Sequence, residues 1–226
     1  TSVGYLDISR DGNLVAYAVR DGGVDEVSIR LHDVETGQDL DDVLPPARYG
    51  QVNLTPDRAG FYYERYGDVT PRVMFHVIGT DSSTDLQLFG NGYQRHHIPV
   101  SVLSDDGRWL LVHVIEGSSG PTEIHLKDLT SDAPFETVIR DGVSESWAEF
   151  AGDQIVITTN LDAPNRRVVL VDPEMPSVEH WREIIPERTN VVVQGARGLG
   201  GRLVVSFLQE VQPRVAVHEL SGAHVR

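Results

Sequence analysis

Short apolar runs, each preceded by a polar turn, recur along the whole chain. The clearest run covers residues 108–114, which are rich in strand-forming residues and follow the dipeptide Asp106-Gly107. Glycine adopts positive φ without a Cβ clash, so this dipeptide favours a tight turn, and the run after it favours a strand. The pattern therefore predicts one strand that enters the turn and another that leaves it.

This unit occurs five times. The apolar runs follow turns at residues 9–12, 55–58, 104–107, 152–153 and 200–201, and successive turns lie 46 to 49 residues apart. A further strand-forming segment belongs to each unit, at residues 27–34, 72–78, 122–129, 167–171 and 214–220. A period of this length with about four short strands is typical of a propeller blade, whereas solenoid repeats of similar length are helical.

The predicted fold class is therefore all-β, a single β-propeller domain or propeller fragment with about five four-stranded blades. The repeats cover residues of about 5–43, 50–89, 96–139, 146–185 and 191–226, and the fifth is expected to lack its outer strand. One helical turn is predicted, at residues 176–183. An uncovered Val, Leu or Phe on an end blade forgoes roughly 1.5–3 kcal/mol of burial. We therefore expect the five blades either to close on themselves or to have their ends covered by another chain or by sequence absent here.

Composition and charge exclude several classes of protein. The chain has 226 residues, is 40% hydrophobic and carries a formal net charge of -15, which disfavours binding to nucleic acid or to an anionic membrane. Cysteine is absent, so disulfides, a thiol nucleophile and thiolate metal sites are excluded. No signal-like or membrane-spanning segment is visible. We expect a soluble, cytoplasmic protein.

Catalytic and metal-binding patterns are weak in this sequence. The string Gly117-Ser118-Ser119-Gly120 has the wrong spacing for a nucleophile elbow and lies in a predicted hairpin. His113 and His125 are interpreted as ordinary strand residues. His96 and His97 are adjacent in a predicted strand and should point to opposite faces, which disfavours a shared metal ion. No metal and no cofactor are expected.

The paired charged residues have simpler interpretations than catalysis. Asp105-Asp106 is explained by turn formation, in which Asp side chains accept nearby backbone N–H groups, and Asp41-Asp42 is also given a structural role. Arg166-Arg167 could bind a phosphate or carboxylate, but the pair flanks a strand start and is interpreted as part of the rim.

One segment carries a family resemblance. Residues 75–85, Phe-His-Val-Ile-Gly-Thr-Asp-Ser-Ser-Thr-Asp, resemble the Tyr-His-x-Leu-Gly-Thr-x-x-x-x-Asp segment of the prolyl oligopeptidase propeller. Further matches follow in the order of that family, and they include residues 33–37 with 42–44, 104–108 with 116–117, 159–160 with 163–164, and 203–208 with 218–220. The chain is identified as similar to the N-terminal β-propeller of the prolyl oligopeptidase family over essentially its whole length.

The resemblance implies a fold and an activity. In this family a seven-bladed propeller covers the serine active site of an α/β-hydrolase domain, admits short peptides and excludes folded proteins. The chain resembles blades two to six, and the hydrolase domain has no counterpart in it. The expected partners are therefore short proline-containing peptides and the α/β-hydrolase domain of the parent protein, and the chain alone should be inactive.

The resemblance also implies site residues. Tyr49 falls where the family has an aromatic residue that packs against substrate, and Ile98 and Ser118 fall where a Met and a Cys line the same pocket. Asp25 matches an Asp that faces the catalytic domain. The sequence departs from the family pattern at Ile115, where a substrate-contacting Arg can occur, and at Glu26, where a Trp is common.

Three functions are open at this point. The first is the substrate-gating propeller of a prolyl oligopeptidase-like serine peptidase that cleaves short peptides after proline. The second is a free-standing β-propeller that binds peptides or proteins. The third, a propeller hydrolase or lactonase with a metal in its central channel, would need converging carboxylates and histidines that the pattern does not offer.

Overall fold

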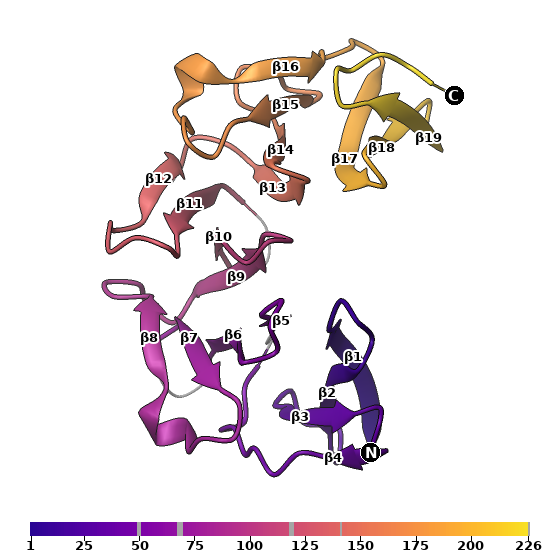
Figure 1. Ribbon diagram of the computed structural model, residues 1–226. Coiled ribbons are helices and arrows are strands. Elements are labelled where there is room, and N and C mark those ends of the chain that lie inside the picture. Colours follow the sequence, from indigo (N-terminus) through magenta and orange to yellow (C-terminus); the bar gives the residue numbers. More distant parts are fainter. Residues whose placement is uncertain (49–50, 67–69, 118–119, 141, 226) are drawn as a thin grey trace. The chain divides into compact units, whose positions relative to one another are not determined.

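The computed structural model describes residues 1–48, 51–66, 70–117, 120–140 and 142–225. It is built from antiparallel meanders, in which each strand pairs with the next along the chain (Figure 1). The chain divides into two compact units, residues 1–107 and 108–226. No helix among the described residues is long and apolar enough to cross a membrane.

The first unit contains two complete four-stranded sheets. The first sheet consists of β1 (Ser2–Ile8), β2 (Leu14–Arg20), β3 (Ser28–Asp33) and β4 (Gln38–Asp39). The second consists of β5 (Val52–Leu54), β6 (Gly60–Arg65), β7 (Arg72–Val77) and β8 (Leu86–Phe89). A short 3-10 helix, η1 (Ser82–Thr84), precedes β8.

The third sheet is shared between the units in sequence. Its first strand, β9 (His97–Leu103), belongs to the first unit, and the second unit holds β10 (Trp109–Glu116), β11 (Thr122–Asp128) and β12 (Glu136–Ile139). The fourth sheet consists of β13 (Ser146–Ala151), β14 (Gln154–Thr159), β15 (Arg167–Val171) and β16 (Arg182–Ile185), with the 3-10 helix η2 (Val178–His180) before β16. The fifth has three strands, β17 (Val191–Leu199), β18 (Arg202–Gln209) and β19 (Gln212–Glu219).

The apolar cores lie between consecutive sheets. In the first unit, alternate residues of β2 and β3, such as Leu14 and Leu31, pack with Phe61 and Tyr63 of β6. In the second unit, Val168 and Leu170 of the fourth sheet pack in one cluster with residues of the fifth sheet such as Val205. Strand residues point alternately to opposite faces, so each middle sheet can bury both of its faces. By contrast, β1 leaves Val3 and Tyr5 mostly exposed, at 67% and 66%.

Polar side chains join neighbouring sheets where the inner strands have free backbone donors. In the first unit, Asp7 Oδ2 accepts from the Leu54 backbone N–H at 2.8 Å, and Asn53 Oδ1 accepts from the Leu103 N–H at 3.2 Å. Partial burial raises the pKa of Asp7, and these hydrogen bonds oppose the rise. Such contacts satisfy inner-strand N–H groups that have no ladder partner on that side.

The segment that resembles the family motif forms a buried network in the first unit. His76 lies between two carboxylates, with Nδ1 2.7 Å from Asp85 and Nε2 2.9 Å from Asp42, and all three side chains are almost fully buried. Asp42 also accepts from the Gly79 N–H at 2.6 Å, and Asp85 accepts from the Tyr63 hydroxyl at 2.7 Å. The network fixes the crossover after the first sheet against the second sheet.

Candidate functional site

The antiparallel order places the connections of every sheet at two opposite ends of its strands. The start of the first strand, the connection between the second and third strands, and the crossover to the next sheet all lie at the same end of the strands. We call this the crossover edge. The hairpin between the first and second strands lies at the opposite edge, as does the hairpin between the third and fourth strands in the four-stranded sheets.

Two of the residues that the family resemblance implies, Ile98 and Asp25, belong to segments of the crossover edge. Ile98 is the second residue of β9 and is partly buried, and Asp25 is exposed in the connection between β2 and β3. No hydrogen bond or ion pair of the described residues joins these two side chains. Tyr49 and Ser118 lie outside the described residues, so the roles expected for all four residues stay predictions.

A charged pair fixes the segment that leads to Tyr49 in the sequence. Arg48 donates to Glu26 Oε1 from Nε at 2.7 Å and from Nη2 at 2.6 Å. The hydrogen bond from Arg48 lowers the pKa of Glu26. Beside this pair, Val27 and Ala47 exchange backbone hydrogen bonds of 2.9 and 3.1 Å. Glu26, which departs from the family pattern, therefore connects the Asp25 segment to the crossover.

The second unit contains a cavity of about 240 Å³ at the crossover edge. We call it the Trp147 pocket, because Trp147, the second residue of β13, provides an aromatic wall. Ile115 at the end of β10 provides an aliphatic wall. Polar side chains from the fourth and fifth sheets and their connections also line the pocket: Glu145, Thr158, Arg166 and Gln194.

Trp147 is held in place by its neighbours. Its ring stacks on His113 with the centroids 4.1 Å apart and the planes 8° from parallel. His113 is fully buried, and its Nε2 accepts from the Ala148 backbone N–H at 3.0 Å, so Nε2 is the unprotonated nitrogen. The Trp147 indole N–H donates to Glu149 at 3.2 Å, and Glu149 accepts two hydrogen bonds from Arg197, of 2.8 and 3.0 Å.

Arg166 and Glu145 form an ion pair at the pocket. Arg166 Nη2 lies 2.8 Å from Glu145 Oε2, and the Glu145 backbone N–H donates to Asn160 Oδ1 at 2.7 Å. Arg166 has a φ of 66°, a left-handed conformation that is uncommon for a residue with a Cβ. Arg166 therefore lies beside a cavity with aromatic and aliphatic walls. Its assignment to the rim of the propeller stays a prediction.

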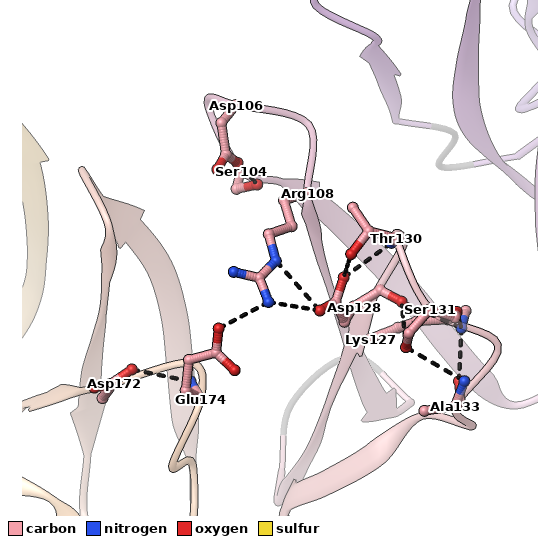
Figure 2. Close-up of polar contacts among 10 residues, drawn as sticks. All are labelled: Ser104, Asp106, Arg108, Lys127, Asp128, Thr130, Ser131, Ala133, Asp172 and Glu174. Atoms are coloured by element: carbon pink, nitrogen blue, oxygen red, sulfur yellow. Dashed lines mark hydrogen bonds and ion pairs between the residues drawn. The ribbon is translucent and has the colours of Figure 1, made fainter.

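The opposite edge of the second unit is occupied by a structural ion-pair network (Figure 2). Arg108 Nη2 lies 2.7 Å from Asp128 of the third sheet and 2.7 Å from Glu174, which precedes β16 of the fourth sheet. The hydrogen bond from Arg108 holds the pKa of Asp128 far below its usual range. Lys127 donates to three carbonyl oxygens of the adjoining turn, those of Asp128, Ser131 and Ala133. This network joins two sheets and has no free reactive group.

In the first unit, a cavity of about 180 Å³ lies where β1, β5 and β9 end. Its walls are mostly polar and include Asp7 and Asn53, which already cap the neighbouring strands. An exposed ion pair between Arg10 and Asp105, 2.7 Å long, lies beside it. The cavity lacks an aromatic wall, so it is the weaker candidate for ligand binding.

One sequence interpretation of histidine is changed by the structure. The rings of His96 and His97 lie with centroids 4.1 Å apart, so the expectation that they point to opposite faces is wrong. The reason is that His96 precedes β9 and lies in a turn, where strand alternation does not apply. Across the residues that the structure describes, no group of three or more His, Asp or Glu side chains is arranged to hold a metal ion.

The described side chains are suited to binding rather than to covalent chemistry. Ser177 Oγ and His180 Nδ1 lie 3.1 Å apart, but this pair is exposed in the segment around η2. No hydrogen bond from His180 to a carboxylate is found in the described part of the chain, so no third group orients the imidazole as a nucleophile's base requires.

Comparison with known proteins identifies the class and then the family. The consecutive four-stranded meanders are the blades of a β-propeller. A family model described as "Prolyl oligopeptidase, N-terminal beta-propeller domain" matches residues 1–226. The chain therefore belongs to the N-terminal β-propeller domain family of the prolyl oligopeptidases, as its sequence predicts.

Relatives of known sequence are much longer than this chain. It is 30% identical over 239 residues to a prolyl endopeptidase of Elizabethkingia meningoseptica, an alignment that covers 100% of this chain and 33% of the relative. It is 27% identical over 209 residues to dipeptidyl aminopeptidase BI of Pseudoxanthomonas mexicana, covering 91% of this chain and 28% of that protein. The chain thus spans about a third of the length of these relatives.

Solved structures give the same result. A structure from a study of two prolyl endopeptidases, on inter-domain dynamics in catalysis and specificity, superposes with a TM-score of 0.90 at 26% identity. It is matched by 100% of this chain and over 35% of its own length. Prolyl oligopeptidase B from Galerina marginata, bound to a 35mer hydrolysis and macrocyclization substrate, gives a TM-score of 0.86 at 21% identity, with 100% and 34% covered. The latter likeness concerns the fold alone.

Proposed function

We propose that this chain is the substrate-gating propeller of a prolyl oligopeptidase-like serine peptidase that cleaves short peptides after proline. The observation that carries the proposal is the match of the family model to all 226 residues. The partners would be short proline-containing peptides and the α/β-hydrolase domain of the parent protein. The proposal includes a cytoplasmic location and requires no cofactor.

The chemistry of the described residues supports a role in binding for this chain and a role in hydrolysis for the other domain. They supply a cavity with aromatic, aliphatic and paired charged groups, but no oriented nucleophile and base. Hydrolysis would therefore come from the other domain, and this chain would bind peptides and limit access. Ion pairs at the opposite edge, such as Arg108 with Glu174, would keep the third and fourth sheets together while peptides pass.

The test uses the full-length protein that contains this chain. A chromogenic peptide with proline before the scissile bond is compared with a folded protein that displays the same sequence in a surface loop. Cleavage of the peptide with sparing of the folded protein is expected, and the isolated 226-residue chain should give no turnover. Equal cleavage of both substrates would show that the propeller does not gate access.

A second candidate from another class is a free-standing peptide-binding module, which the Trp147 pocket would also serve. The two are separated by the reading frame that encodes this chain. A downstream Gly-x-Ser-x-Gly segment followed by Asp and then His supports the peptidase. Peptide binding by a protein without such a segment, and without turnover, would support the module instead.

A further inference from the structure

We propose that the Trp147 pocket is a specificity pocket that takes one apolar side chain from an uncharged stretch of a peptide substrate. The inference deepens the proposed function and rests on it in one respect, which is that the ligand is a peptide. It does not depend on which domain performs the hydrolysis.

The walls of the pocket fit an apolar side chain. Trp147 remains 37% exposed although one face of its ring is stacked on His113, so its remaining surface is open to a ligand. Ile115 supplies a second apolar wall from the third sheet. The cavity of about 240 Å³ is smaller than the ~300–1,000 Å³ typical of drug-sized ligands, and it therefore suits a side chain with part of its main chain.

The charges at the pocket favour a neutral ligand. Arg166 is paired with Glu145, and Glu149, which holds Trp147, is paired with Arg197. Each cation is thus matched by an anion, and an acidic ligand would have to displace Glu145 to reach the Arg166 guanidinium. A peptide group avoids this competition, because its C=O can accept from Arg166 while its N–H donates to Glu145.

The pocket is preorganised for this task. His113 is fully buried and fixes the Trp147 ring, while Asn160 fixes the Glu145 backbone. Side chains that are already held lose little freedom when a ligand binds, so the binding energy is not consumed in ordering them. The Gln194 carboxamide, at the fifth-sheet side of the pocket, can both donate and accept and is equally suited to a peptide main chain.

The experiment measures equilibrium binding to the full-length protein by calorimetry. The probes are capped peptides of equal length with one fixed proline, in which each other position in turn carries Leu, Ala or Asp. At one position we expect the Leu peptide to bind about 10-fold more tightly than the Ala peptide, because an apolar pocket discriminates by roughly that factor. At the same position the Asp peptide should bind no better than the Ala peptide.

Variants assign the discrimination to the pocket. Trp147→Ala should abolish the difference between the Leu and Ala peptides, and Trp147→Phe, which keeps an aromatic wall, should retain part of it. Trp181→Ala is the matched control, because Trp181 lies outside the pocket and its indole donates to the Pro176 carbonyl. Thermal unfolding confirms that each variant is folded, and the Phe variant carries the test if Trp147→Ala is not.

Each outcome separates this inference from the proposed function. The Asp peptide could instead bind most tightly and lose that advantage in the Arg166→Gln variant. This result would show that the pocket binds an anionic side chain, and it would overturn the inference. Unchanged discrimination in both Trp147 variants would overturn it as well. If discrimination is lost as expected but no peptide is hydrolysed, the pocket assignment stands and the peptidase proposal fails.

Discussion

The same three side chains occur at equivalent positions of the first two sheets but differ in burial. In each sheet a Tyr hydroxyl and a His Nδ1 contact one Asp, and the two sets are Tyr17, His32 and Asp39, and Tyr63, His76 and Asp85. The first His–Asp pair is 37% and 39% exposed, whereas the second is 0% and 1% exposed. Asp42 adds a second carboxylate only to the buried set. We therefore expect the surroundings, and not the side chains themselves, to determine how much each set contributes to the free energy of unfolding.

His76 connects two buried carboxyl groups. Its Nδ1 lies 2.7 Å from Asp85 and its Nε2 lies 2.9 Å from Asp42. His76→Gln would take a hydrogen-bond partner from both buried carboxyl groups. We expect it to lower the free energy of unfolding by about 3–5 kcal/mol, because buried polar groups left without partners are costly, measured by urea denaturation.

His32→Gln provides the matched control for this prediction. The exchange is the same and an Asp partner of Nδ1 is lost in both cases, but His32 contacts Asp39 without a second carboxyl group and its site is open to solvent. A much smaller change is expected, because water screens exposed ion pairs. Equal losses in the two variants would mean that the burial of His76 contributes nothing.

The sequence could identify the residues of this network but not their contacts. Residues 75–85 and Asp42 were both selected by the family resemblance. However, His76 and Asp42 are 34 residues apart, and their pairing follows from the crossover that folds back onto the second sheet. No local sequence pattern indicates that these two residues are in contact.

The strand pattern was predicted well at the level of single elements. Segments expected at residues 72–78 and 167–171 are β7 (Arg72–Val77) and β15 (Arg167–Val171), and the predicted turn at 176–183 contains η2 (Val178–His180). The short η1 helix (Ser82–Thr84) was missed. It is capped by Asp81 and has no buried residue, so it leaves no apolar periodicity in the sequence.

The close approach of β17 to the fourth sheet makes Gly198 sensitive to substitution. A Cβ at this position would overlap the Ala151 side chain and lie 2.7 Å from the Ala151 Cα. Because Ala151 is buried in the core between the two sheets, neither strand can move without disturbing the packing. Gly198→Ala should therefore destabilise the chain by about 1–3 kcal/mol in urea denaturation.

Gly195→Ala is the control on the same strand. Its Cβ would meet only Ser206 Oγ, at 3.7 Å, which is an ordinary contact. The substitution should change the free energy of unfolding by less than about 0.5 kcal/mol. If Gly198→Ala were equally neutral, the two sheets would have to be less tightly packed than the structure shows.

At the scale of the molecule, the family and fold were predictable and the binding pocket was not. Repeated turns and a motif near residues 75–85 suffice for a propeller of the prolyl oligopeptidase family, which is confirmed. The Trp147 pocket combines residues from three sheets, separated by up to 79 positions from Ile115 to Gln194.

The charge of the whole chain and one buried carboxylate both make stability depend on pH. With 34 acidic and 19 basic residues, the chain repels itself near neutral pH, and this repulsion weakens as the pH falls towards the pI of about 4.9. Glu64 is fully buried and accepts hydrogen bonds from the Ser101 N–H and hydroxyl and from the Gln51 N–H. Burial outweighs these hydrogen bonds and raises the pKa of Glu64 to about 7.

The sign of the Glu64 contribution follows from its raised pKa. Between about pH 4.5 and pH 7 the folded chain holds a proton that the unfolded chain has lost, so the free energy of unfolding falls as the pH rises. The total change is at most about 3 kcal/mol. Glu64→Gln should remove this part of the slope, whereas Glu35→Gln, at an exposed position, should retain it. Urea denaturation at several pH values measures both.

Salt separates the local contribution from the global one. Repulsion between exposed charges is screened at high ionic strength, but a buried carboxylate is screened much less. In 0.5 M salt the unmodified chain should therefore keep a slope between pH 5 and 7 that Glu64→Gln lacks. If salt abolished the slope in both proteins, surface repulsion alone would account for the pH dependence, and Glu64 would titrate as an ordinary carboxyl group.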